Sequence, residues 1–351
     1  MKYLSLLDPH VHLRGAEYPN HDFLGMGLRD AAAVGLAGVL EMPNTTPWLT
    51  TESIVKERLE SVKRREFDEI YHGINVGITT DRSQVVKVSM SHWKGVHAFK
   101  IFFAGSTNSM TCSDPDYQKW VWRSISTGYL GTSRVVIGHF EDETKYVGKF
   151  DPADPISHSR HQTPFAELQS IETQLKNAIG AGFRGTFYIA HLTCPAALDL
   201  VRFARRLAPF KIVVEVTWHH LLLNTNLYAK IGNRAKCNPP LRSPEVQESL
   251  LVNLLSRDDI DIIATDHAPH PIERKDDPVA PASGLPGLPF WPRGIQLLRN
   301  NGMSEQRIAD LTFHNANRVF NLGLTPREVD KEYNPELWVK YGYNPYEYFG
   351  E

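Results

Sequence analysis

Short apolar segments alternate with longer amphipathic segments along most of the chain. The apolar segments are rich in Val, Ile, Leu and Phe, a composition typical of strands buried on both faces of a sheet. They lie at residues 4–7, 38–42, 71–78, 96–103, 135–139, 186–191, 211–216 and 260–265. Between most of them the pattern predicts helices, among them residues 51–65, 164–179 and 195–207.

Strands that alternate with helices predict an α/β fold with a parallel sheet, and eight strands are the number that closes a TIM barrel. An open doubly wound sheet is the alternative, but no glycine fingerprint follows the first strand. We therefore expect a (β/α)₈ barrel over residues 1–324. Residues 325–351, rich in Tyr, Asn and Pro, are expected to pack on the barrel or at an oligomer contact. Residues 105–116 and 270–292 are expected to be loops.

Composition narrows the class of protein. The 351 residues carry a net charge of −2, which gives no electrostatic reason to expect nucleic acid or an anionic membrane as a partner. Three widely spaced cysteines favour neither a disulfide framework nor a cysteine–zinc site. The apolar run at the start is too short for a signal peptide, and no membrane-length segment follows. A cytoplasmic location is the resulting expectation.

Polar residues stand where five of the predicted strands end. The carboxyl ends of barrel strands share one face, which is where active sites of such barrels form. We therefore expect a single site built from His10, His12, Lys100, His139, His191 and Asp266.

His-x-His on an extended segment places both imidazoles on one side, and imidazoles suit a metal such as zinc. Taken singly, His139 or His191 is better explained as a core histidine bonded to backbone. Lys100 alone is better explained as a surface lysine. Burial beside a metal would instead favour its neutral amine, which can take up carbon dioxide to form a carbamate that bridges two metals.

Several motifs resemble those of the dihydroorotases of the amidohydrolase superfamily. The first runs Asp-Pro-His-Val-His-Leu-Arg over residues 8–14. Further matching segments occur in the family's order at residues 42–45, 99–102, 138–143, 190–193, 219–223, 238–242 and 264–270. The resemblance implies a barrel of the amidohydrolase type. Because His10 lies close to the start, it implies no full N-terminal β-sandwich such as longer relatives carry.

The resemblance also implies the residue roles. His10 and His12 would bind one zinc ion, His139 and His191 a second, and carboxylated Lys100 would bridge both. Asp266 would complete the first site and carry the proton from the attacking water to the leaving nitrogen. The substrate carboxylate would be held by Arg14, Asn44 and His270. Without the resemblance, Asn44 could simply shape a turn and His270 could be a surface histidine.

Four further residues receive weaker expectations. Thr107 matches the position of a substrate-covering loop in some dihydroorotases. The neighbouring histidines His219 and His220 are expected to support the fold or the ligands rather than bind metal, because the six ligands are already assigned. His267, next to Asp266, is expected to support the ligands in the same way.

The implied reaction is the reversible, zinc-dependent interconversion of L-dihydroorotate and N-carbamoyl-L-aspartate in de novo pyrimidine (UMP) biosynthesis. The alternatives are another cyclic amidohydrolase, such as a hydantoinase, dihydropyrimidinase or allantoinase, and a non-catalytic scaffold subunit. Arg14 argues against uncharged substrates, and the retention of all six ligands argues against a scaffold. A homodimer and association with aspartate transcarbamoylase are expected from the family alone.

Overall fold

Eight parallel strands form a barrel in the computed structural model, which describes residues 1–105, 110–128 and 134–349. The strands follow one another around the sheet in chain order and pair in parallel, so each neighbour is reached by a crossover connection of the kind that a barrel requires. They are β2 (Leu6–Val11), β3 (Leu36–Glu41), β4 (Tyr71–Gly77), β5 (Val96–Phe102), β6 (Val135–His139), β7 (Thr186–Ile189), β8 (Lys211–Thr217) and β9 (Ile262–Ala264).

The ring closes between the segment that follows β9 and the end of β2. Val11 and His267 form a parallel bridge, and the backbone amide of His12 donates to the carbonyl of His267 at 2.7 Å. The expected (β/α)₈ barrel is therefore confirmed.

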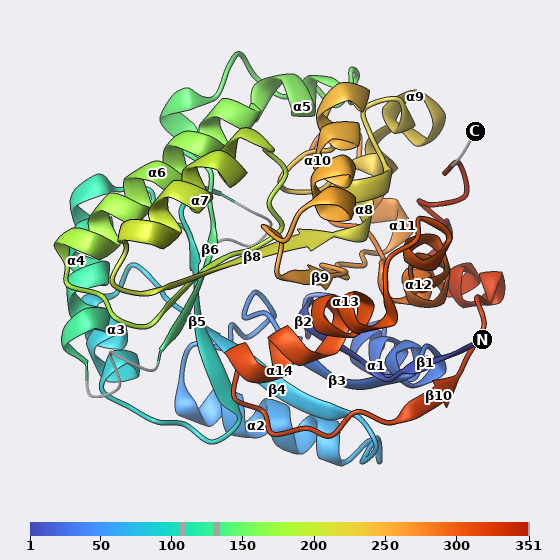
Figure 1. Ribbon diagram of the computed structural model, residues 1–351, viewed down its shortest axis with the longest axis horizontal. Coiled ribbons are helices and arrows are strands. Elements are labelled where there is room, and N and C mark those ends of the chain that lie inside the picture. Colours follow the sequence, from blue (N-terminus) through green and yellow to red (C-terminus); the bar gives the residue numbers. More distant parts are fainter. Residues whose placement is uncertain (106–109, 129–133, 350–351) are drawn as a thin grey trace.

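Helices surround the strands on the outside (Figure 1). The longer ones are α1 (Phe23–Ala33), α2 (Glu52–Lys63), α3 (Arg82–Ser89), α4 (Pro115–Thr127), α6 (Pro164–Gly180), α7 (Ala196–Leu207), α10 (Pro244–Ser256) and α12 (Trp291–Asn300). Short helical segments fill the connections: α5 (Ser157–His161), α8 (Trp218–Leu222), α9 (Leu227–Ile231), α11 (Ile272–Lys275), α13 (Glu305–Ala309), α14 (Asn315–Val319) and η1 (Glu143–Lys145), η2 (Gly232–Ala235), η3 (Leu288–Phe290), η4 (Asp310–His314), η5 (Pro335–Tyr341).

The start of α6 illustrates how local sequence sets a helix boundary. The hydroxyl of Thr163 caps the helix by accepting from the backbone amide of Ala166, and Pro164 occupies the first turn. Proline is tolerated there because its missing N–H has no helical partner in any case.

Alternation along each strand divides the apolar residues between two cores. Ala98 and Lys100 share one face of β5 and point into the barrel, while Phe99 and Ile101 pack outward against the helices. The inner core also contains Leu40, Ile137 and Tyr188. At its lower end it packs on residues of η4 and α14. The interior is thus filled with side chains below the level of Lys100, which confines the site to the upper mouth.

Two sequence predictions are wrong in detail. The single strand expected at residues 4–7 is divided, because β1 (Lys2–Leu4) ends before β2 begins and pairs antiparallel with β10 (Glu328–Asp330). Residues 270–292 are not one loop: they contain α11 and η3, and Pro292 lies in the first turn of α12. The proline-rich composition was therefore misleading, since proline is favourable in the first turn of a helix. In the other expected loop, α4 already begins at Pro115, and Thr107 lies outside the described residues.

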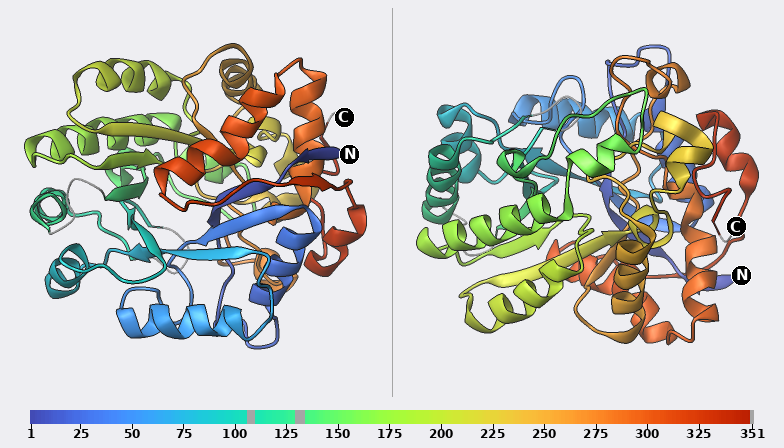
Figure 2. Two further views of the ribbon diagram at one scale, coloured as in Figure 1. Left: turned by 60° about the horizontal axis from the view of Figure 1, so that its bottom comes forward. Right: turned by 90° about the horizontal axis from the view of Figure 1, so that it is seen from above.

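The C-terminal segment lies beside the N-terminal strand (Figure 2). Beyond β10, the ring of Tyr346 stacks on Phe290 with ring centroids 4.0 Å apart, and the hydroxyl of Tyr341 donates to Asp30 of α1 at 2.5 Å. The division of the chain at residue 324 stays a prediction. In the part of the chain that the structure describes, no helix is long and apolar enough to cross a membrane.

Candidate functional site

A small cavity opens at the carboxyl ends of the barrel strands. The structure brings every predicted site residue except His270 into its wall, and His270 contacts Arg14 directly behind it. The lining residues are His10, His12, Arg14, Asn44, Lys100, Phe102, His139, His191, Asn238, Asp266, Ala268, Ser283 and Gly284. Residues as distant as 10 and 284 therefore share one small polar space.

One side of the cavity is formed by two histidines and an aspartate. The Nε2 atoms of His10 and His12 lie 3.3 and 2.9 Å from Oδ1 of Asp266. Ligand atoms of these three buried residues all lie within 4.8 Å of one another, a spacing compatible with one shared metal ion. Burial would raise the pKa of the Asp266 carboxyl, but His10 and His12 hold it well below its ordinary value. The carboxylate is thus ionised and able to act as a ligand or a base.

Hydrogen bonds on the side away from Asp266 orient the rings of His10 and His12. Nδ1 of His10 lies 2.7 Å from Oε1 of Glu215, and Nδ1 of His12 lies 2.5 Å from Oδ1 of Asn44. Because these oxygens are acceptors, each Nδ1 carries the proton and each Nε2 keeps its lone pair free toward the cavity. Such partners are what metal-binding histidines use to set their tautomer.

The opposite side of the cavity contains the second histidine pair. Nδ1 of His139 and Nε2 of His191 lie 3.1 Å apart, so both lone pairs converge on one point. Nε2 of His139 is held by Oε2 of Glu141 at 3.0 Å. His139 therefore points Nδ1 toward the cavity, whereas the other three histidines point Nε2.

Lys100 lies between the two sides on β5 and is fully buried. Its Nζ has no hydrogen-bond partner among the described residues. Burial lowers the pKa of Lys100 to about 8, although Glu215 and Asp266 counteract this effect. A buried Nζ that has no partner, and whose lowered pKa enlarges the fraction of neutral amine, fits the predicted carbamate-forming lysine better than a surface lysine.

Three residues of the site have backbones in the left-handed region, with φ of 57° at Arg14, 39° at His191 and 45° at Asp266. Residues other than glycine pay a conformational cost there, and such strain gathers at functional sites. Arg14 lies beyond the end of β2 at Val11, so it reaches the cavity from an irregular segment with a left-handed backbone and not from the strand itself.

Arg14 is the only predicted cation of the substrate side, and its guanidinium is buried. Its Nε donates to the carbonyl of Pro269 at 2.9 Å, and its Nη2 lies 2.8 Å from Nε2 of His270. In the tautomer whose Nε2 accepts from Arg14, Nδ1 of His270 donates to the hydroxyl of Tyr18 at 2.6 Å, and the carbonyl of Ser283 lies 2.8 Å from the same Nε2. His270 therefore fixes the arginine rather than lining the cavity itself.

Sequence reasoning missed several residues of the site. Glu215 is fully buried on β8 and accepts from His10, from the backbone amide of His191 and from the hydroxyl of Tyr188. An acidic residue inside the apolar strand at 211–216 was a detectable signal, because a buried carboxylate needs partners. Tyr18 and Ser283 gave no comparable signal, since both lie in loops whose path the sequence does not predict.

The structure treats the three histidines that were expected to play supporting roles, His219, His220 and His267, differently. Nδ1 of His267 accepts from the backbone amides of Gly287 and Leu288, so this residue braces the loop beyond Asp266. His220 is bonded to the hydroxyl of Thr217 at 2.7 Å and the carbonyl of Pro239 at 2.9 Å, as a supporting residue should be. For His219 the structure shows no such bond among the described residues.

This arrangement combines two sets of metal-ligand atoms, a buried basic residue between them, an ionised carboxylate and a fixed cation. Paired metal sites activate water and polarise a carbonyl. The cation adds a place for an anionic group of a substrate.

This chain is similar to curated dihydroorotases along most of its length. The dihydroorotase of Methanosarcina mazei is 29% identical over 343 residues, which cover 95% of this chain and 73% of the relative. That of Halobacterium salinarum is 29% identical over 321 residues, covering 91% of this chain and 72% of the relative. No protein-family model matches the chain.

Solved structures agree on the fold. An L-hydantoinase (dihydropyrimidinase) from Arthrobacter aurescens superposes with a TM-score of 0.77 at 22% identity, covering 92% of this chain and 72% of that one. A dihydroorotase from Saccharomyces cerevisiae in complex with 5-fluoroorotic acid gives a TM-score of 0.72 at 17% identity, covering 92% and 85%. The expected amidohydrolase type of barrel is confirmed, and the chain is similar in sequence to the dihydroorotases, which are hydrolases of cyclic amide bonds.

Proposed function

We propose that this protein is a dihydroorotase, which interconverts L-dihydroorotate and N-carbamoyl-L-aspartate. The observation that carries the proposal is Arg14, a buried cation at the cavity wall. Among the described residues no carboxylate forms an ion pair with it, and its direct partners are the Pro269 carbonyl and His270, although Glu17, Asp266 and Glu41 lie near enough to favour its charged form. A buried charge without a carboxylate in direct contact is unfavourable, and a substrate carboxylate would supply such a contact.

Asn44 serves both halves of the proposed site. Its Oδ1 is committed to His12, which leaves the amide nitrogen of the same side chain as a donor at the cavity wall. An amide donor and a guanidinium suit the two oxygens of a carboxylate. His270 contributes by orienting Arg14, so we assign it a positioning role within the predicted clamp.

The residues present fit two zinc ions. Free Nε2 atoms of His10 and His12 with the Asp266 carboxylate form one set of ligands, and the converging nitrogens of His139 and His191 form the other. Lys100, carboxylated at its unpartnered Nζ, would bridge the sets. When bound, the two ions would lower the pKa of water and polarise the ring amide carbonyl.

Asp266 would move the proton. Its carboxylate accepts a proton as water attacks the ring carbonyl, and it returns that proton to the ring nitrogen as the C–N bond breaks. The same steps in reverse close the ring of carbamoyl aspartate. The ionised state of Asp266, held by His10 and His12, gives it the capacity to start this cycle.

The wider setting follows from the same proposal. The reaction would belong to de novo pyrimidine biosynthesis in the cytoplasm, with a small-molecule substrate. A homodimer, association with aspartate transcarbamoylase, and the absence of nucleic-acid and membrane partners stay predictions.

The test is turnover of L-dihydroorotate by the zinc-loaded protein, followed by its ultraviolet absorbance, with hydantoin and dihydrouracil in parallel. Selective hydrolysis of dihydroorotate is expected. Turnover of only the uncharged rings would favour the hydantoinase alternative, which the superposition with the Arthrobacter enzyme keeps in view. No turnover of any of the three would favour the scaffold alternative.

A further inference from the structure

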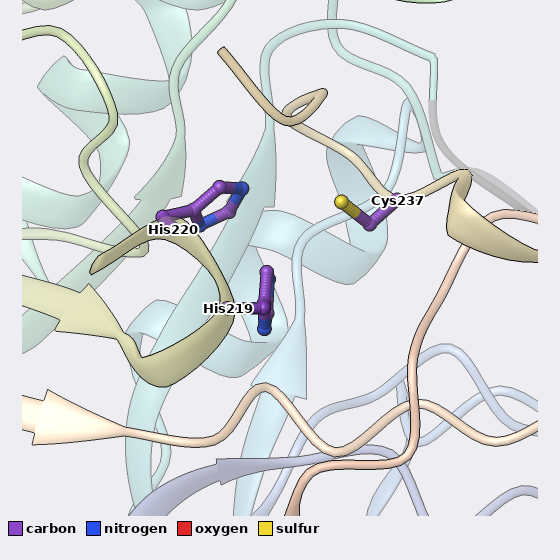
Figure 3. Close-up of side chains that lie close together, drawn as sticks. All are labelled: His219, His220 and Cys237. Carbon is purple, nitrogen blue, oxygen red and sulfur yellow. The ribbon is translucent and has the colours of Figure 1, made fainter. Parts of the chain in front are cut away.

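A second group of metal-ligand side chains shares none of the six residues assigned above. His219 and His220 belong to α8, which follows β8, and Cys237 lies just beyond η2. One ligand atom of each residue lies within 4.8 Å of the others, and all three residues are buried. Figure 3 shows the sulfur of Cys237 pointing toward the two imidazole rings.

The hydrogen bonds in this group are unevenly distributed. Nε2 of His220 and Sγ of Cys237 both reach the carbonyl oxygen of Pro239, at 2.9 and 3.3 Å. His219 is 1% exposed, yet neither of its ring nitrogens has a partner among the described residues. A neutral imidazole always carries one N–H donor and one lone pair. Leaving both unmet in a buried place is unfavourable, so His219 requires a partner that protein atoms do not supply.

We propose that His219, His220 and Cys237 bind a metal ion of the zinc class, at a site separate from the predicted binuclear centre. Two imidazoles and a thiolate are the donor types that zinc prefers, and a carbonyl or water would complete four ligands. The unmet lone pair of His219 would then have a partner.

Binding has a defined proton balance. Burial raises the pKa of the Cys237 thiol to about 12, so the sulfur is protonated when no metal is bound. Forming the metal–sulfur bond releases the thiol proton to solvent. Forming the bond to Nε2 of His220 moves the imidazole proton to Nδ1, and this N–H can then donate a hydrogen bond to the hydroxyl oxygen of Thr217.

The position suggests a structural role for this ion. It would join α8, at the end of β8, to the segment that carries Asn238, and Asn238 lines the cavity. The site would therefore fix one wall of the cavity without touching the substrate. The proposal is independent of the proposed reaction, because it shares no ligand with it.

Cobalt(II) gives a direct test, because a cobalt–thiolate bond produces a charge-transfer absorption in the near ultraviolet that nitrogen and oxygen ligands do not. None of the six predicted ligands of the binuclear centre contains sulfur. The metal-free protein, kept reduced, would be titrated with Co²⁺. We expect this absorption in the wild type and its loss in Cys237→Ser. Cys112→Ser and Cys194→Ser, which replace buried cysteines outside the group, should retain it.

Metal analysis gives the second readout. Cys237→Ser should bind one ion per chain fewer than Cys112→Ser. X-ray absorption of the zinc-loaded wild type needs no variant and should show a sulfur neighbour at about 2.3 Å. The proposal is wrong if the wild type shows only nitrogen and oxygen neighbours and no thiolate absorption, or if the absorption survives in Cys237→Ser. Either result leaves the dihydroorotase test untouched.

Discussion

The guanidinium of Arg58 donates a hydrogen bond from Nη2 to the backbone carbonyl oxygen of Arg14 at 2.6 Å. Arg58 also forms a two-point ion pair with the buried carboxylate of Glu41, and Nε2 of His72 lies 2.9 Å from the same carboxylate. The left-handed backbone at Arg14 is thus held by a buried ionic cluster that begins at the end of β3. Arg58 belongs to α2, so this helix holds the backbone of the proposed substrate-binding residue Arg14 in place.

Replacing Arg58 with Met should destabilise the protein in a pH-dependent manner. Burial would raise the pKa of Glu41 from its ordinary 4.5, but Arg58 and His72 hold it at about 2. The pair therefore stabilises the fold fully above pH 4.5, and this contribution is lost as the pH falls toward 2. Removing Arg58 leaves the buried Glu41 carboxylate with His72 as its remaining partner and without a permanent counter-charge, at a cost of up to about 3–5 kcal/mol near neutral pH.

Urea unfolding of wild type and Arg58→Met at pH 7 and pH 3 measures this difference. The gap in free energy of unfolding should be larger at pH 7. Lys56→Met is the matched control, because Lys56 lies on the same helix in an exposed pair with Glu52 and should change stability by less than about 1 kcal/mol. An equal gap at both pH values would contradict the role of Glu41.

Replacing Arg14 with Met should weaken the use of dihydroorotate and leave the metal content unchanged. A hydrogen-bonded contact with a charged group contributes about 1.5–3 kcal/mol, which corresponds to roughly a ten- to hundredfold lower kcat/KM. The ratio of activity on dihydroorotate to activity on dihydrouracil distinguishes this effect from general damage. An unchanged ratio would show that the arginine does not bind the carboxylate.

Replacing Asp266 with Asn should abolish turnover while most of the metal stays bound. The amide keeps an oxygen ligand near His10 and His12 but cannot accept the proton, so a loss of roughly 10²–10⁴-fold or more is expected. Metal analysis and steady-state kinetics on one preparation provide the measurement. Substantial remaining activity would exclude Asp266 as the proton carrier.

Replacing Lys100 with Ala should remove the bridging ligand and reduce the metal count per chain. Because Lys100 is fully buried and its Nζ has no partner in the described part of the chain, the truncation leaves a space close to the ligands. A short carboxylic acid in solution should enter this space and restore part of the metal and activity. Unchanged metal content in Lys100→Ala would argue against a bridging role.

Lys275 is predicted to fix the loop that forms one wall of the cavity. Its buried Nζ donates to the carbonyls of Lys236, Ala282 and Gly284 at 2.8–2.9 Å. Lys275→Met would leave these acceptors unmet, at about 1–3 kcal/mol each. We expect a lower Tm, faster hydrogen exchange at residues 282–285 and a raised KM. The exposed Lys176→Met should change none of these, and normal exchange in Lys275→Met would refute the assignment.

Much of this protein could be predicted from local sequence. The alternation of apolar and amphipathic segments indicated the eight-stranded barrel, because strand and helix periods are properties of neighbouring residues. The positions of His10, Lys100, His139 and Asp266 at strand ends indicated one shared mouth, because a parallel barrel brings those ends together. The motifs then supplied the resemblance to dihydroorotases that the curated relatives confirm.

Only the tertiary structure decided how these residues are held. The carboxylate of Glu215 meets His10 across 205 positions, Arg14 turns through a left-handed backbone, and His270 lies behind the arginine. Cys237 meets His219 and His220 only because the segment that follows η2 returns to α8. Such contacts depend on loop paths and on the pairing of buried polar groups. No local period encodes these features, because each is set by the energy of a partner far away in the chain.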